Sequence, residues 1–150
     1  MKKFFSLIAS VSALVILAVS CGEKEPVIEY LEVNKNNISG TWSLKEWNGA
    51  ALKEGSFLRM ELIRDDGTFR ITENLDSFED IPRVVTGRYS LENYDDLGAV
   101  ISGDYDHDSG FWTHSYVIRD LTSLSMTWIA VDDENFVQVF ERCSKKLLYL

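Results

Sequence analysis

Short β-rich runs, separated by turn residues, fill the chain from Ser39 onward and limit its fold more than any other feature. Apolar and polar residues alternate within them, as Phe69 and Ile71 do with Arg70, which is typical of strands with one buried face. No segment keeps a helical period of apolar residues. The pattern predicts eight strands, at residues 40–47, 57–64, 68–73, 84–91, 97–102, 111–119, 124–131 and 136–142.

The links between these runs are short, which favours a simple order of antiparallel strands. Asp65-Asp66-Gly67 is typical of a hairpin turn, and the link at 48–56 has room for a helical turn. Many short strands at regular spacing indicate a sandwich or a barrel. A meander favours the barrel, because closure removes exposed strand edges. We therefore predict an all-β fold, an eight-stranded antiparallel up-and-down barrel, over residues 39–150.

The first twenty residues have the pattern of a secretory signal, with a basic start followed by an uncharged apolar run from Phe4 to Ser20. The sequence Ala18-Val19-Ser20-Cys21 that ends this run resembles a bacterial lipobox. The resemblance implies that Cys21 is lipidated and becomes the new N-terminus. A plain cleaved signal followed by a stray cysteine is the alternative. The predicted organisation is a signal peptide at 1–20, a lipidated cysteine and tether at 21–38, and the barrel at 39–150.

The residues after Cys21 bear on where the protein resides. The segment 22–26 is polar and ends at Pro26, so it predicts a flexible tether. Its two glutamates resemble the surface-export signal of Bacteroidota lipoproteins, and the periplasmic face is the alternative. We expect an outer-membrane lipoprotein of the bacterial cell envelope, held to the membrane by its acyl chains.

Charge and cysteine content exclude several classes of partner. The formal net charge is −9, with 24 acidic against 15 basic residues, so we expect no nucleic-acid partner, which would require a basic face. Hydrophobic residues make up 45% of the chain and charged residues 26%, a balance typical of a globular domain. Two cysteines are too few for a disulfide framework or a four-cysteine zinc site.

Two distant segments resemble a known family. Gly40-Thr41-Trp42 opens the first predicted strand, and Arg142 lies near the end of the last. Together with eight strands they resemble the signature of the lipocalin, or calycin, family, and the chain is similar to lipocalin-like lipoproteins of the Bacteroidota type. The resemblance implies that Arg142 packs over Trp42 and closes the bottom of the barrel. A guanidinium over an indole ring is stabilised by cation–π attraction.

Aromatic residues concentrate on the predicted inward face of several strands. If they line a cavity, a small apolar ligand is the expected partner, because such pockets are the usual form of small-molecule sites. A packed interior with internally hydrogen-bonded Tyr and His side chains is the alternative. The protein would then be a structural or interaction module that binds an envelope protein or glycan, with Trp47 on the outer face opposite Trp42. The candidate ligand-binding residues are Tyr89, Trp112, His114, Tyr116 and Trp128.

The remaining motifs give little chemistry. The chain has no Gly-x-Ser-x-Gly, phosphate-binding glycine loop or His-Glu-x-x-His, so we expect neither an enzyme nor a cofactor. Asp104, Asp106 and Asp108 alternate in an acidic loop and form a weak candidate for calcium, although the spacing fails the EF-hand pattern. A solvated turn is the alternative, and no other metal site is predicted.

Overall fold

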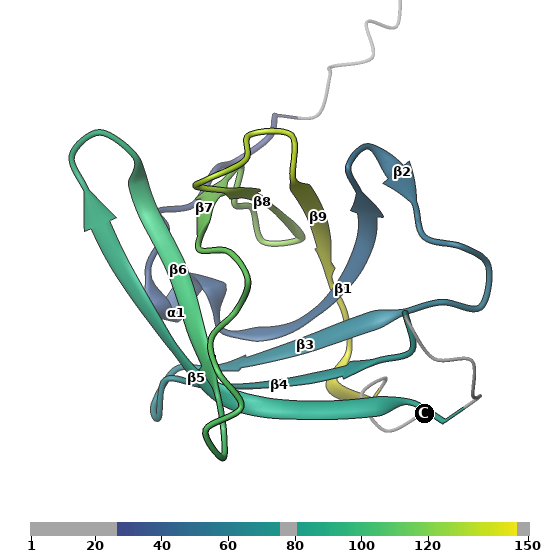
Figure 1. Ribbon diagram of the computed structural model, residues 1–150. Coiled ribbons are helices and arrows are strands. Elements are labelled where there is room, and N and C mark those ends of the chain that lie inside the picture. The colour runs from purple at the N-terminus through teal and green to yellow at the C-terminus, as the bar shows by residue number, and fades with distance from the viewer. Residues whose placement is uncertain (1–26, 76–80, 147–150) are drawn as a thin grey trace, which may run out of the picture.

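The computed structural model describes residues 27–75 and 81–146, which form a closed antiparallel barrel (Figure 1). The sheet runs β2-β1-β3-β4-β5-β6-β7-β8-β9, and a further pairing of β1 with β9 closes it. β2 pairs only with the last two residues of β1, so the ring itself consists of the other eight strands. The predicted eight-stranded up-and-down barrel is confirmed. The elements are α1 (Lys35–Ile38), β1 (Gly40–Trp47), β2 (Ala50–Ala51), β3 (Leu58–Ile63), β4 (Thr68–Glu73), β5 (Arg83–Tyr94), β6 (Gly98–Tyr105), β7 (Tyr116–Arg119), β8 (Ser125–Ala130) and β9 (Val137–Arg142).

The wall between β6 and β7 differs from the prediction. The strand expected from residue 111 begins only at Tyr116, and two residue pairs join it to β6. Phe111 forms an isolated bridge with Asp104, and the Trp112 amide donates to the Gly103 carbonyl at 2.8 Å. The Trp112 ring lies directly against Gly103, where any Cβ would collide with it. The Trp112 ring occupies the space in which regular pairing with β6 would continue. Residues 112–115 therefore form part of the barrel wall without being a strand.

The neighbouring hairpin is longer than predicted. β5 and β6 pair from Gly87 with Tyr105 to Tyr94 with Gly98, so Tyr105 belongs to a strand and not to a loop. On the other side of the barrel, residues 50–51 form the short strand β2 where the sequence left room for a helical turn. β2 pairs with the end of β1 through Trp47 and Ala50.

A β-bulge in β1 decides which way its second tryptophan faces. Leu44 pairs with Phe140, but Glu46 pairs with Val139, so one extra residue enters the strand at Lys45. An inserted residue reverses the inward–outward alternation beyond it. Trp47 therefore turns inward, like Trp42, and contacts the interior ring of Phe136. The expectation of an outward Trp47 is wrong because strict alternation does not hold across the bulge.

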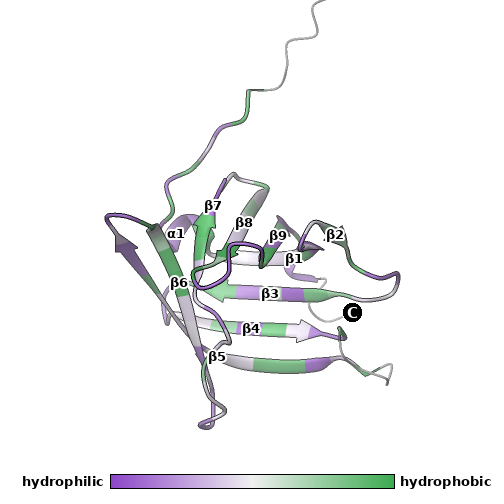
Figure 2. Cartoon of the chain, turned by 45° about the horizontal axis from the view of Figure 1, so that its top comes forward, coloured by the Kyte–Doolittle hydropathy of each residue, from purple (hydrophilic) through white to green (hydrophobic). Residues whose placement is uncertain are grey.

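The apolar core gathers at one end of the barrel. Hydrophobic and hydrophilic residues alternate along strands such as β3 (Figure 2). α1 closes the packed end, since Ile38 is fully buried and its carbonyl accepts a 2.8 Å hydrogen bond from the Trp42 indole. The segment before α1 adds a backbone hydrogen bond from Leu31 to Leu121. The most deeply buried side chains are Trp42, Phe69, Phe140, Ile38, Met60, Leu62, Ile101, Ile118, Leu121 and Met126.

The part of the chain that the structure describes contains no helix with the length and apolar character needed to cross a bilayer. The predicted signal peptide, Cys21 and the start of the tether lie outside the described residues.

Candidate functional site

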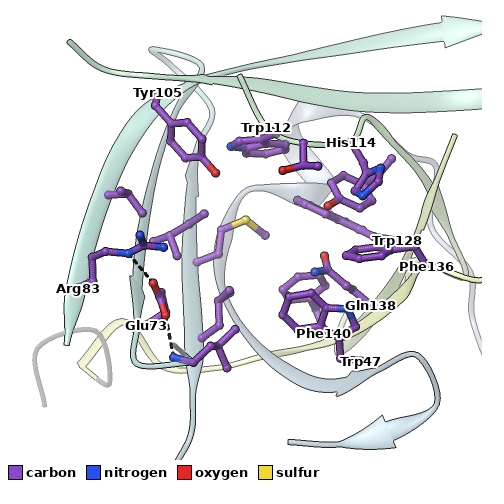
Figure 3. Close-up of a pocket in the computed structure, with 17 residues that line it drawn as sticks. Trp47, Glu73, Arg83, Tyr105, Trp112, His114, Trp128, Phe136, Gln138 and Phe140 are labelled. Carbon is purple, nitrogen blue, oxygen red and sulfur yellow. Dashed lines mark hydrogen bonds and ion pairs between the residues drawn. The ribbon is translucent and has the colours of Figure 1, made fainter. Parts of the chain in front are cut away.

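A cavity of about 360 Å³ occupies the barrel beyond the packed core and is partly open to solvent (Figure 3). Its volume lies at the lower end of the range typical of small-molecule sites. Most of its lining is aromatic or aliphatic, with a few polar side chains among them. The lining residues are Trp47, Leu58, Met60, Ile71, Glu73, Leu75, Arg83, Val85, Tyr105, Trp112, Thr113, His114, Tyr116, Trp128, Phe136, Gln138 and Phe140.

One wall of the cavity is a continuous surface of aromatic rings from β7, β8, β9 and the segments beside them. Trp128 lies at its centre, with ring centroids 5.3 Å from Tyr116, 5.7 Å from Trp112 and 4.9 Å from Phe140. The planes of Trp128 and Tyr116 differ by only 35°. Trp128 is only 3% exposed because these rings pack on one another, and the half-buried rings of Trp112, His114 and Phe136 complete the wall at the cavity.

The opposite wall comes from β3, β4 and β5 and is mainly aliphatic. Met60, Ile71 and Val85 lie on paired positions of these strands, with Met60 opposite Ile71 and Ile71 opposite Val85. These three side chains contribute apolar area to the cavity. The two walls together enclose a space that is apolar on both sides.

One ion pair stands at the edge of the aliphatic wall. Glu73 and Arg83 are register partners on β4 and β5, and the Arg83 Nε donates to Glu73 Oε1 at 2.6 Å. The second carboxylate oxygen of Glu73 accepts from the Leu75 amide at 2.7 Å. The Glu73 side chain is only 6% exposed, so both oxygens of this buried carboxylate are satisfied within the protein.

A second polar pair stabilises the aromatic wall from outside. His114 Nδ1 and Asp132 Oδ1 are 2.7 Å apart, and the hydrogen bond lowers the pKa of the Asp132 carboxyl. The His114 ring also packs 4.6 Å from Phe136, centroid to centroid. Asp132 thus fixes the orientation of a ring that lines the cavity.

The phenols of the cavity stay neutral over a wide pH range. Burial raises the pKa of Tyr116 to about 12 and also raises the pKa of Tyr105, although Arg83 near Tyr105 opposes the shift. Both hydroxyl groups are therefore hydrogen-bond donors at neutral pH.

The structure brings four of the five predicted ligand-binding residues together. Trp112, His114, Tyr116 and Trp128 all line the cavity, which leaves their role in binding as a prediction. Tyr89 does not line it: its hydroxyl donates to the Ile63 carbonyl at 3.3 Å, and its ring is held among the core residues.

Sequence reasoning missed several lining residues. Trp47 was hidden by the bulge, and Tyr105 by its assignment to a loop. The sequence does not indicate that Glu73 and Arg83 line a cavity. An acidic residue at the end of one strand and a basic residue at the start of the next are common in solvent-exposed hairpins, so the pair does not stand out. Extending the predicted strand at 97–102 to residue 105 would have found Tyr105, since it lies on the same face as Ile101 and Gly103.

A hollow of about 400 Å³ lies on the outer side of the thin wall between β6 and β7. Trp112 and His114 line both this outer hollow and the inner cavity, so they form the partition between the two. The Trp112 Nε1 is buried without a hydrogen-bond partner in the part of the chain that is described. Phe111 stands at this outer hollow with its side chain 81% exposed.

Within the described residues Asp104, Asp106 and Asp108 are not grouped as metal ligands, and calcium binding there stays a prediction. Among residues 27–75 and 81–146, no three His, Cys, Asp or Glu side chains converge as metal ligands. Asp106 Oδ2 instead accepts from the Thr86 hydroxyl at 2.7 Å. Left-handed backbone at His107 and Asp108 reverses the chain, so the acids belong to a tight turn and do not wrap around a common centre.

The pair that the lipocalin resemblance singles out is in contact. The Arg142 guanidinium lies 4.1 Å from the centroid of the Trp42 ring, and the two residues are register partners across β1 and β9. This contact lies at the closed end of the barrel, away from the cavity, and it supports the fold rather than a site.

Comparison of the chain with protein-family models, with curated proteins and with solved structures finds no match. The closed barrel is consistent with a lipocalin-like fold.

Proposed function

We propose that the protein binds a small, largely apolar ligand in the barrel cavity without transforming it chemically. The observation that carries the proposal is the open space of about 360 Å³ that the aromatic wall around Trp128 borders. Apolar area removed from water contributes about 25 cal/mol per Å², so a ligand burying ~250 Å² gains ~6 kcal/mol. The loss of translational and rotational freedom on binding offsets part of this gain, so polar contacts add to the affinity that the ligand needs.

The barrel interior consists of a packed end and an open end, which supports ligand binding over a fully packed core. The end near Trp42 and Ile38 is packed with fully buried side chains. The other end keeps its space although eight strands allow the interior to be filled by side chains alone. A barrel of the lipocalin type that serves as a ligand carrier or sensor has this division.

Titration with the neutral fluorescent probe N-phenylnaphthylamine tests the proposal. We expect saturable fluorescence enhancement with the unaltered protein and at least a tenfold weaker affinity in Trp128→Ala. Leu124→Ala is the matched control, because Leu124 is adjacent to β8 but 71% exposed. The proposal fails if Trp128→Ala binds the probe as tightly as the unaltered protein does.

The alternative function, a module that binds an envelope protein or glycan by its outer surface, has one observation in its favour. Phe111 is 81% exposed at the outer hollow, where an aromatic ring is available for stacking on a partner. A protein that takes up no apolar probe, but loses a cell-envelope cross-link on Phe111→Ser, would favour this second function.

We further propose that Cys21 carries the acyl anchor of an outer-membrane lipoprotein, on either the periplasmic or the surface side. The lipobox resemblance supports this, and Cys21 lies outside the described residues. Metabolic labelling with an alkyne fatty acid tests it. We expect the label and the membrane association to be lost in Cys21→Ser and kept in Cys143→Ser.

A further inference from the structure

Gln138 is a buried polar side chain whose amide takes no part in the hydrogen bonds of the described residues. It lies on β9 among the cavity's aromatic rings and is only 7% exposed. Its amide has no hydrogen-bond partner among residues 27–75 and 81–146. Neither amide atom is sealed from solvent, so both are reached from the cavity, into which the amide points (Figure 3). An amide without a protein partner that opens on a cavity is available to a ligand, and a ligand that displaces water from it must replace those hydrogen bonds.

The position of Gln138 relative to the aromatic wall limits what it can recognise. Gln138 pairs with Trp128 across β8 and β9, and with Trp47 across β9 and β1. Directly opposite residues on neighbouring strands have Cβ atoms about 5 Å apart. A flat ring that packs in the cavity against this wall therefore has its edge beside the Gln138 amide.

The chemistry of the amide limits the ligand further. A carboxamide offers one acceptor oxygen and one donor NH₂ side by side. The edge that satisfies both carries an adjacent donor and acceptor, as a lactam, an imide or a primary amide does. The carboxylate of Glu73 does not require a charged ligand, because it already accepts hydrogen bonds from Arg83 and from the Leu75 amide.

We propose that the cavity selects an uncharged, flat ring compound with a lactam-type edge, packed against the aromatic wall and held in two hydrogen bonds by Gln138. This inference rests on the ligand-binding function proposed above and gives the ligand its chemical class. Contact with the apolar lining supplies most of the affinity, and Gln138 supplies the selectivity, since a bound ligand without the matching edge leaves the amide unpaired.

Three bicyclic probes of the same size test the proposal by calorimetry on the full chain. Carbostyril carries a lactam edge, coumarin replaces its N–H by a ring oxygen, and naphthalene has no polar edge. We expect carbostyril to bind about tenfold more tightly than coumarin or naphthalene, because coumarin loses one hydrogen bond and sets its ring oxygen against the amide oxygen. In Gln138→Met, a substitution of similar length and flexibility, we expect the three affinities to converge within twofold.

Glu141→Gln is the matched control, because Glu141 lies on the same strand and its side chain is 59% exposed. It should leave all three affinities unchanged. Equal binding of the three probes to the unaltered protein would overturn the selectivity of Gln138 and leave the ligand-binding function standing. A carbostyril preference that survives in Gln138→Met would also overturn it. Binding of none of the probes would overturn the proposed function itself.

Discussion

Arg142 covers the face of Trp42 and ties together three backbone segments at the closed end of the barrel. Its guanidinium lies 4.1 Å from the ring centroid and donates to the carbonyls of Ser39, Asn37 and Ser123 at 2.7, 2.9 and 2.9 Å. Gly40 makes room for it, since a Cβ there would collide with the guanidinium. One side chain thus joins the last strand to α1, to the start of β1 and to the link before β8.

Arg142→Ala should lower the free energy of unfolding by about 2–4 kcal/mol, because it removes a cation–π contact and leaves three carbonyls unpaired. Arg142→Lys should recover less than half of the loss, since an ammonium lacks the planar fork of donors. Urea unfolding measures both. Arg64→Ala, at a largely exposed ion pair, is the control and should cost less than about 1 kcal/mol. An equally small loss in Arg142→Ala would contradict the role assigned to Arg142.

The pair of His114 and Asp132 should make stability depend on acid. The hydrogen bond from His114 lowers the pKa of Asp132 in the folded state below its ordinary value of 3.8. Its contribution is therefore complete above the unfolded pKa and is lost as the pH falls through the lower folded pKa. Asp132→Asn should be less stable than the unaltered protein at neutral pH, and the difference should vanish below that folded pKa. Urea midpoints across this range measure it.

Asp96→Asn, in the turn between β5 and β6, is the control and should show no such convergence. A stability difference for Asp132→Asn that persists unchanged in strong acid would show that the carboxylate charge is not what stabilises the pair.

Tyr116 should make stability depend on alkali. Burial raises its pKa from 10.0 to about 12, so the unfolded chain loses this proton at lower pH than the folded barrel does. Stability is complete below pH 10.0 and falls as the pH rises toward 12. Tyr116→Phe should flatten this fall, and Tyr30→Phe, at a 61% exposed ring, should not. Ultraviolet titration of the phenolates gives a direct check, and a Tyr116 that ionises near pH 10 would contradict the burial argument.

Alternation and turn chemistry sufficed to predict the closed barrel, because both are local signals with a strict period of two. Trp128 and Tyr116 were placed on the cavity wall by that period alone. Arg142 and Trp42 are paired only by family resemblance, since the two residues lie 100 positions apart in the sequence, on the two strands that close the ring.

What could not be predicted depends on packing between distant segments. Whether residues 112–115 form a ladder depends on the fit of the Trp112 ring against Gly103, two positions that local pattern does not connect. Tyr89 shares the inward face of β5, yet its hydroxyl is used at the closed end of the barrel rather than at the cavity. The direction of a side chain follows from alternation, but its height along the barrel does not.

The bulge at Lys45 gives the sharpest test of this distinction, because it moves Trp47 from the surface to the cavity. Trp47→Ala should lower the free energy of unfolding by about 2–3 kcal/mol, since it removes a half-buried ring and its edge-on contact with Phe136. It should also weaken binding of N-phenylnaphthylamine. Leu124→Ala, at a 71% exposed position, should change stability by less than about 0.5 kcal/mol. If the two substitutions cost the same and the probe binds unchanged, Trp47 faces outward and strict alternation holds through β1.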